Sequence, residues 1–237
     1  MEKFISRNAL ILGLLALGCG RGKGGSESGS GSEEADPDDS FLCVPDSEGP
    51  FPAALYNHGG LGDAIGGDLD STCEALAEAG YLAYSKQRRL TMSLEGHLDD
   101  VQAGLDVLQG HDDWDGGEMA ILGFSRGGLL TLQAAKDQPD LFAAVILMAP
   151  ADAKGTLMSE LQDVVSISAP VLVLVSENDL YQDDHVALAK AVRDALEAAG
   201  KDVQYIMYEP YGDDGHERFF EVGSYWTDVI DFLQATR

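Results

Sequence analysis

Short apolar runs alternate with amphipathic stretches along most of this 237-residue chain. The apolar runs are rich in Val, Ile, Leu and Ala and are bounded by Gly, Pro or Asp, which predicts buried parallel strands. We expect these strands at 53–57, 80–85, 118–124, 143–149, 170–176 and 203–208. Between them, apolar residues recur at helical spacing and predict helices near 68–79, 97–109, 126–137, 185–199 and 218–235. Strict alternation of strand and helix predicts an α/β fold, a doubly wound, mostly parallel sheet of about 6–8 strands.

The first 40 residues have a different pattern. Lys3 and Arg7 precede an apolar core over 9–17, followed by Gly18 and Cys19, which is typical of a secretory signal peptide. This core is shorter than the roughly 20 apolar residues of a membrane span. Residues 19–40 are almost wholly Gly, Ser and acidic residues and predict a flexible tether, which leaves 41–237 as one domain.

The end of the apolar core, Leu-Ala-Leu-Gly-Cys over residues 15–19, resembles a bacterial lipoprotein signal. The resemblance implies that residues 1–18 are removed and that Cys19 carries a lipid. We therefore expect an exported protein that is anchored to the membrane and faces the periplasm or the cell surface. Secretion without a lipid is the alternative.

Two further cysteines, Cys43 and Cys73, remain in the predicted domain. An even number of cysteines in an exported chain predicts a disulfide. Two separate buried thiols are the alternative.

Acidic residues dominate the charge of the chain. It has 41 Asp and Glu against 15 Lys and Arg, with a net charge of -26. Such a field repels polyanions, so nucleic acid and anionic lipid surfaces are poor partners. Several acidic pairs adjoin a histidine, but none has the spacing of an EF-hand loop or an H-E-x-x-H pair, so we expect no metal site.

One basic cluster stands against this acidic background. Lys86, Arg88 and Arg89 follow the strand expected at 80–85, and the loop after a parallel strand opens on the edge where ligands bind. A guanidinium matches the planar geometry of a carboxylate, so Arg88 or Arg89 is a candidate for binding substrate. The alternative is an ion pair with one of the abundant surface acids.

Three polar side chains follow predicted strands in an order that indicates nucleophilic catalysis. Ser125 lies in Gly-Phe-Ser-Arg-Gly-Gly over 123–128, between a strand and a helix, where glycines permit the tight turn of a nucleophile elbow. Asp179 follows the strand expected at 170–176, and His216 lies in a turn-rich loop after 203–208. Serine, acid and histidine in this order predict a catalytic triad.

Four motifs together resemble the α/β-hydrolase superfamily from about residue 50 to 237, closest to its dienelactone-hydrolase-like and prolyl-oligopeptidase-like branches. They are Asn57-His58-Gly59-Gly60-Leu61-Gly62, residues 123–128, Glu177-Asn178-Asp179 and Gly215-His216-Glu217-Arg218-Phe219. The resemblance implies hydrolysis through a Ser-His-acid triad with no cofactor. The chain departs from the family at the acid, where relatives often have Gly-x-x-Asp and this chain has Ser-Glu-Asn-Asp, so Glu177 and Asp183 stay open as alternatives.

The same resemblance places an oxyanion hole. Its donors would be the backbone N–H of Arg126 and, by similarity to H-G-x loops, that of Gly60, with Leu61 as the alternative. We expect His58 to shape this loop, with a part in proton transfer as the alternative. For the other histidines, His97, His111 and His185, we expect surface or capping roles.

The prediction for function is a serine hydrolase that cleaves carboxylic esters. Many relatives insert a lid where this chain has only the residues of 150–169, so we expect an open cleft and small, soluble or short-chain ester substrates. A prolyl-oligopeptidase-like peptidase is one alternative, disfavoured because we expect no propeller-sized domain ahead of the hydrolase. A non-catalytic lipoprotein that uses the fold for surface binding is the other.

Overall fold

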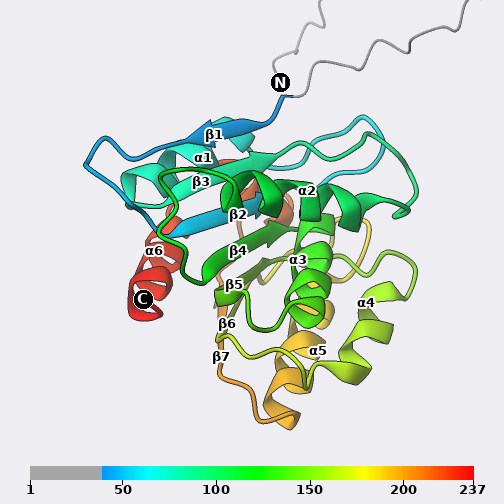
Figure 1. The fold of residues 1–237 in the computed structure, drawn as a ribbon. Coiled ribbons are helices and arrows are strands. Elements are labelled where there is room, and N and C mark those ends of the chain that lie inside the picture. Colours follow the sequence, from blue (N-terminus) through cyan, green and yellow to red (C-terminus); the bar gives the residue numbers. More distant parts are fainter. Residues whose placement is uncertain (1–38) are drawn as a thin grey trace, which may run out of the picture. The chain divides into compact units, whose positions relative to one another are not determined.

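The computed structural model describes residues 39–237 (Figure 1). The signal peptide over 1–18, the lipidated Cys19 and nearly all of the tether over 19–40 lie outside the described residues and stay predictions. Among residues 39–237, no helix combines the length and the apolar composition that crossing a membrane requires.

Seven strands form one sheet in the order β1-β3-β2-β4-β5-β6-β7. Strands β2 to β7 run parallel, and β1 is antiparallel to β3 at the edge. The predicted fold class is therefore confirmed. The strands are β1 (Phe41–Cys43), β2 (Ala53–Asn57), β3 (Leu82–Lys86), β4 (Met119–Phe124), β5 (Phe142–Met148), β6 (Val171–Ser176) and β7 (Val203–Tyr208).

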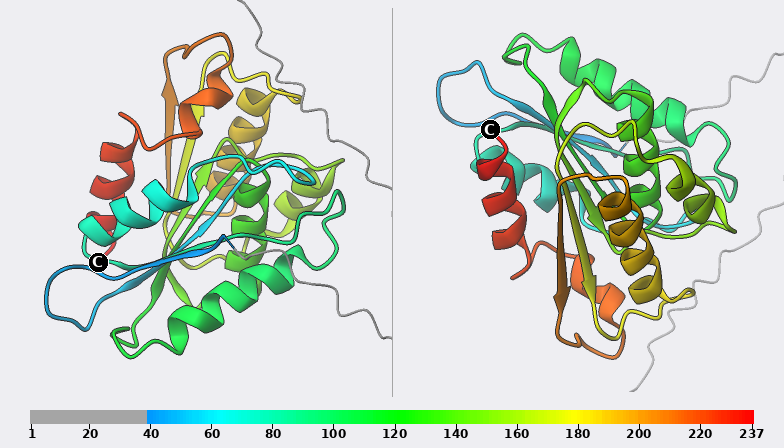
Figure 2. Two further views of the ribbon diagram at one scale, coloured as in Figure 1. Left: turned by 90° about the horizontal axis from the view of Figure 1, so that it is seen from above. Right: turned by 90° about the horizontal axis from the view of Figure 1, so that it is seen from below.

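Helices cover both faces of the sheet (Figure 2). On one face lie α1 and α6, and on the other α2, α3 and α5. Because successive strand residues point to opposite faces, Leu55 and Tyr56 on β2 belong to different core clusters. The helices are α1 (Leu69–Glu78), α2 (His97–Gln109), α3 (Arg126–Asp137), α4 (Thr156–Glu160), α5 (His185–Ala198) and α6 (Trp226–Ala235), with short 3-10 helices η1 (Leu161–Asp163) and η2 (Gly215–Phe219).

The single helix expected over 218–235 is wrong. The chain instead forms η2 and, after a break, α6. The side chain of Asp214 accepts a hydrogen bond from the N–H of His216 at 3.0 Å and begins η2. Gly223 and Ser224, both poor helix formers, lie in the break. This break allows His216 to sit on its own short turn at the sheet edge.

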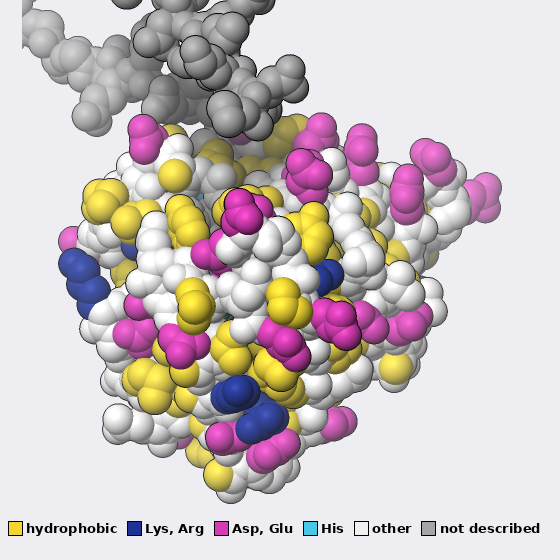
Figure 3. Space-filling model, turned by 180° about the vertical axis from the view of Figure 1, so that it is seen from behind, with side chains coloured by type: hydrophobic (Ala, Val, Ile, Leu, Met, Phe, Trp, Pro, Cys, Tyr) yellow, Lys and Arg dark blue, Asp and Glu magenta, His cyan; other side chains and the backbone are white. Residues whose placement is uncertain are grey.

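The segment from Phe41 forms the antiparallel edge strand β1. A disulfide between Cys43 and Cys73 joins β1 to α1, with 5.7 Å between the two Cα atoms. Figure 3 shows the molecule from behind, where acidic side chains are spread over the surface among few Lys and Arg.

Candidate active site

Ser125 occupies a strained turn between β4 and α3. Its φ is 53° and its ψ is -116°, a conformation rare for any residue with a side chain. The flanking glycines are required for close packing, because a Cβ on Gly123 would lie 2.2 Å from the carbonyl oxygen of Gly127. A Cβ on Gly127 would lie 1.9 Å from the carbonyl oxygen of Asn57. This geometry is that of a nucleophile elbow.

Asp179 and His216 meet at the carboxyl ends of β6 and β7. Nδ1 of His216 lies 2.9 Å from Oδ1 and 3.0 Å from Oδ2 of Asp179, and both side chains are buried. A backbone bond from the N–H of Gly215 to the carbonyl of Asn178 joins the two loops at 3.2 Å. The carboxylate can only accept, so Nδ1 carries the proton and Nε2 is left as the basic nitrogen.

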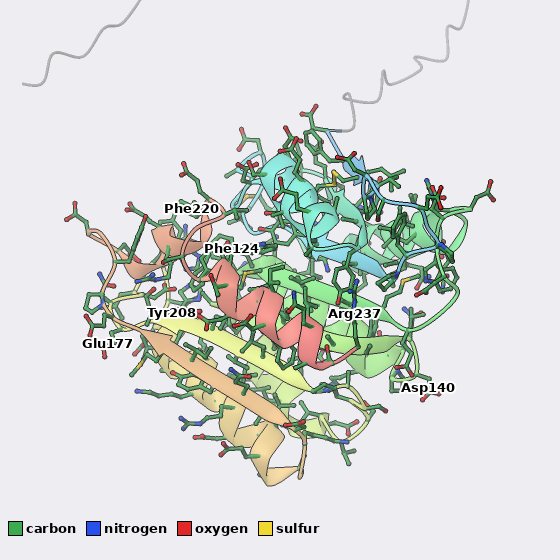
Figure 4. The ribbon with its side chains drawn as sticks, turned by 90° about the vertical axis from the view of Figure 1, so that its left-hand side faces the viewer. Phe124, Asp140, Glu177, Tyr208, Phe220 and Arg237 are labelled. Carbon is green, nitrogen blue, oxygen red and sulfur yellow. A yellow bond between two sulfur atoms is a disulfide. The ribbon has the colours of Figure 1, made fainter. Side chains whose placement is uncertain are left out.

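The alternatives for the acid do not reach the histidine. Glu177 and Asp183 are exposed, and among residues 39–237 only the Asp179 carboxylate bonds to the imidazole ring of His216. Glu177 is labelled at this edge in Figure 4, together with Phe124 and Phe220.

Aromatic rings surround the imidazole of His216. The ring centre of Phe124 lies 4.6 Å away, that of Tyr181 5.1 Å away in a stacked arrangement, and that of Phe220 6.1 Å away. Since Phe124 directly precedes Ser125, this packing brings the imidazole close to the turn that holds Ser125. Within the described chain no hydrogen bond joins Ser125 to His216, and such bonds are often long before substrate binds.

The ring of His185 also contacts the imidazole of His216. The expectation of surface or capping roles for His97 and His185 is wrong. Both are buried, whereas His111 is partly exposed and accepts the N–H of Asp113 at 3.2 Å. The ring of His185 lies 4.3 Å from that of His216. Burial, followed by the neighbouring His216, lowers the pKa of His185 and favours its neutral form.

The loop after β2 packs against Ser125. A Cβ on Gly59 would lie 3.1 Å from the Cβ of Ser125, and Gly59 pairs with Gly66 through two backbone hydrogen bonds of 2.7 and 3.2 Å. Gly60 has a φ of +96°, and a Cβ there would lie 1.8 Å from the carbonyl oxygen of Ala64. Neither the N–H of Gly60 nor that of Arg126 donates a hydrogen bond to another described residue. These two N–H groups are free to bind an oxyanion.

The two arginines proposed for substrate binding have different surroundings. Arg89 forms a bidentate ion pair with Asp100 at 2.8 and 2.9 Å, which favours the ion-pair alternative for this residue. Arg88 is buried, and its guanidinium donates to the carbonyl groups of His58 and Gly59. The sequence does not distinguish Arg88 from Arg89, because the burial and the partners of each side chain depend on the side of the loop after β3 that it faces.

Three residues of this region form the candidate metal site of the described chain, but their bonding partners do not suit metal binding. Asp179, His185 and His216 each offer a ligand atom within 4.8 Å of the others. However, Nδ1 of His216 is bonded to Asp179, and both ring nitrogens of His185 face backbone carbonyls, those of Pro150 and Tyr181. These contacts with neighbouring groups of the chain make the three residues poorly suited to hold a metal ion.

A sizeable hollow of the described chain lies elsewhere. It has a volume of about 710 Å³ and is lined by residues at the amino ends of the strands, among them Phe51, Tyr81 and Glu118. Arg237, which also lines it, is labelled in Figure 4 away from the edge that carries Phe124 and Phe220. None of Ser125, Asp179 and His216 lines this hollow.

Comparison with known proteins identifies the family of this chain and several relatives. Residues 40–216 match the model of the dienelactone hydrolase family. Mitochondrial acyl-coenzyme A thioesterase 2 of Mus musculus is 28% identical over 160 residues, which are 65% of this chain and 34% of that protein. Acyl-coenzyme A thioesterase 1 of Mus musculus is 28% identical over 162 residues, 66% of this chain and 36% of that protein. The chain thus spans about a third of the length of these curated relatives.

Solved structures share the fold. The acetyl ester-xyloside bifunctional hydrolase from Caldicellulosiruptor lactoaceticus superimposes with a TM-score of 0.66 at 16% identity, covering 85% of this chain and 88% of that one. Est1E from Butyrivibrio proteoclasticus gives a TM-score of 0.62 at 16% identity, covering 83% and 93%. At these identities the likeness concerns the fold.

Proposed function

Because the chain belongs to the dienelactone hydrolase family, we propose that it is a serine hydrolase that cleaves small or soluble carboxylic esters through Ser125, His216 and Asp179. The observation that carries this proposal is the bond of His216 Nδ1 to Asp179 beside a serine held on a strained elbow. A buried carboxylate that fixes the imidazole tautomer is the arrangement that activates a serine.

The reaction would proceed in two steps. Nε2 of His216 takes the proton of Ser125 as its oxygen attacks the ester carbonyl, and the N–H groups of Gly60 and Arg126 stabilise the charge on the carbonyl oxygen. His216 then gives the proton to the leaving alcohol, and an acyl-enzyme remains. Water, activated by the same nitrogen, releases the acid and restores the serine.

The preference for small esters is supported by the segment after β5. It holds only α4 and η1 before β6 begins, so no large lid encloses an acyl chain. The relatives' names, acyl-coenzyme A thioesterases and an acetyl ester hydrolase, support acyl transfer to water as the reaction type.

A chain-length series tests this proposal. The full chain is assayed with p-nitrophenyl esters from acetate to decanoate, beside Ser125→Ala and His216→Ala. We expect the highest kcat/KM for the shortest acyl groups and a loss of at least about 10³-fold in both variants. A maximum at decanoate would overturn the substrate class, and full activity in Ser125→Ala would overturn the mechanism.

We also propose that the protein is exported and anchored through a lipid on Cys19. The disulfide between Cys43 and Cys73 supports export, since disulfides persist in oxidising compartments. Metabolic labelling with a radioactive fatty acid in a bacterial host tests this, with Cys19→Ser as the matched variant. Label in both proteins, or in neither, would contradict the anchor.

A further inference from the structure

Arg88 is a buried cation that has no carboxylate partner. Its side chain is 3% exposed, and it takes part in none of the ion pairs between described residues. Asp100 acts on it only from a distance, because that carboxylate is already bonded to Arg89. Burying an unpaired charge is unfavourable, so the position is expected to serve a purpose other than folding stability.

The partners of Arg88 are the carbonyl groups of the loop that follows β2. Its Nη2 donates to the carbonyl oxygen of His58 at 2.5 Å and to that of Gly59 at 3.1 Å. Its backbone N–H donates to Nε2 of His58 at 3.1 Å. One residue therefore ties the loop after β3 to the loop that lies against Ser125.

This grip helps to determine where the Gly60 N–H points, together with Nδ1 of His58, which lies 2.5 Å from the carbonyl oxygen of Gly59. The carbonyl of Gly59 and the N–H of Gly60 belong to one peptide unit, and in a trans peptide these two groups point in opposite directions. A guanidinium that holds the carbonyl therefore turns the N–H away from itself. The preceding peptide unit is fixed as well, because the Gly59 N–H donates to Gly66 at 2.7 Å.

Two neutral histidines complete the surroundings of the guanidinium. Burial, followed by the Arg88 charge, lowers the pKa of His58 to about 3 and the pKa of His97 to about 4. Nη1 of Arg88 lies 3.4 Å from Nδ1 of His97, whose Nε2 lies 3.0 Å from the hydroxyl of Thr91. Burial lowers the pKa of Arg88 itself to about 10, so it stays charged at neutral pH.

We propose that Arg88 is the positioning residue of the oxyanion hole. It fixes the peptide between Gly59 and Gly60 so that the Gly60 N–H is presented to the reacting carbonyl, and it places an uncompensated positive charge behind that donor. The inference rests on the proposed ester hydrolysis, since an oxyanion forms only in that reaction.

Steady-state kinetics with an uncharged substrate test this role. The full chain, Arg88→Gln, Arg88→Lys and the surface control Arg193→Gln are compared with p-nitrophenyl acetate, which has no carboxylate for an arginine to bind. Circular dichroism and thermal unfolding report whether each variant folds. The same proteins are titrated with a trifluoromethyl ketone, whose adduct with serine carries an oxyanion.

A transition-state role predicts a loss in kcat with KM nearly constant. We expect Arg88→Gln to lower kcat by about 10- to 100-fold, less than the roughly 10²- to 10³-fold loss on removing an oxyanion donor. Ketone affinity should fall by the same factor as kcat/KM. Arg88→Lys, which keeps the charge but loses the two-carbonyl grip, should lie between, and it keeps the test decisive if Arg88→Gln does not fold.

A folded Arg88→Gln or Arg88→Lys variant with kcat within about twofold of the wild type overturns the proposal, as does unchanged ketone affinity. The wild-type measurement separates this failure from that of the proposed function. A wild-type chain that hydrolyses no ester and binds no ketone overturns both, whereas an active wild type with active Arg88 variants overturns the role of Arg88 alone.

Discussion

The two halves of the proposed site are held together in different ways. The acid–base half, Asp179 and His216, joins the loops after two adjacent strands, β6 and β7, through a direct bond between the functional side chains. The oxyanion half, Gly60 and Arg126, has functional groups that belong to the backbone, and a third residue, Arg88, holds the Gly60 loop from behind. The functional groups of a site can therefore be positioned in two ways. They can bond directly to each other, or a neighbouring residue that does not contact substrate can hold them in place.

The largest effect should come from the acid–base half. Asp179→Asn keeps the shape of the side chain but no longer favours the useful tautomer of His216, so kcat should fall by about 10⁴-fold. The measurement is kcat for p-nitrophenyl acetate, with circular dichroism to verify folding. The neighbours supply controls: Glu177→Gln and Asp183→Asn should keep kcat within about twofold, and an equal loss in either one would assign the acid differently.

A substitution at Gly60 should disrupt the oxyanion half most directly. Gly60→Ala would place a Cβ 1.8 Å from the carbonyl oxygen of Ala64, so the loop must move and kcat should fall by about 10²- to 10³-fold. Gly155→Ala is the matched control, because Gly155 also has a positive φ, 88°, but nothing lies within 4 Å of the added atom. Comparable losses of kcat in both variants would show that backbone strain alone is responsible.

Reducing the disulfide should affect stability and leave both halves of the site intact. The bond between Cys43 and Cys73 closes a loop of 30 residues, for which chain entropy predicts about 3 to 4 kcal/mol. We expect Cys43→Ala with Cys73→Ala to lower the free energy of unfolding by this amount in urea titrations. The value of kcat should not change, and a parallel loss of activity would link the β1 edge to catalysis.

Lowering the pH should reduce the free energy of unfolding, because His58 and His97 are buried in their neutral forms beside the oxyanion half. The folded pKa of His58 is about 3 and that of His97 about 4, both below the unfolded value of 6.5, so the unfolded chain binds more protons as the pH falls. Stability is complete above pH 6.5 and decreases below it, by at most about 1.4 kcal/mol per pH unit for each histidine. Urea titrations between pH 7 and pH 5 measure this slope. The variant His58→Asn should flatten it, and an unchanged slope would contradict the low pKa of His58.

Much of the fold was predictable because parallel buried strands leave a strong pattern. The run Val171 to Val175 is apolar throughout and predicts a buried strand, whereas the break between η2 and α6 depends on a side-chain cap and a single glycine. Boundaries set by one hydrogen bond are weakly encoded in periodicity.

The pairing of Asp179 with His216 was also predictable, because both side chains follow predicted strands whose carboxyl ends lie at the same edge of the sheet. The burial of Arg88 was not predictable, since Arg88 and Arg89 are the same residue type in one loop and differ only in the direction of their side chains. The sequence analysis also missed the burial of His97 and His185. Each is the first residue of a helix, a position typical of a capping residue, and its burial depends on how the neighbouring loops pack.

The most direct test of the activated serine is covalent labelling. The full chain is treated with a fluorophosphonate, and its mass is measured before and after digestion. We expect one phosphonyl group per chain, located on the peptide that contains Ser125, and no labelling of Ser125→Ala or His216→Ala. Labelling that survives in Ser125→Ala, or a folded wild-type protein that takes up no label, would contradict the catalytic triad.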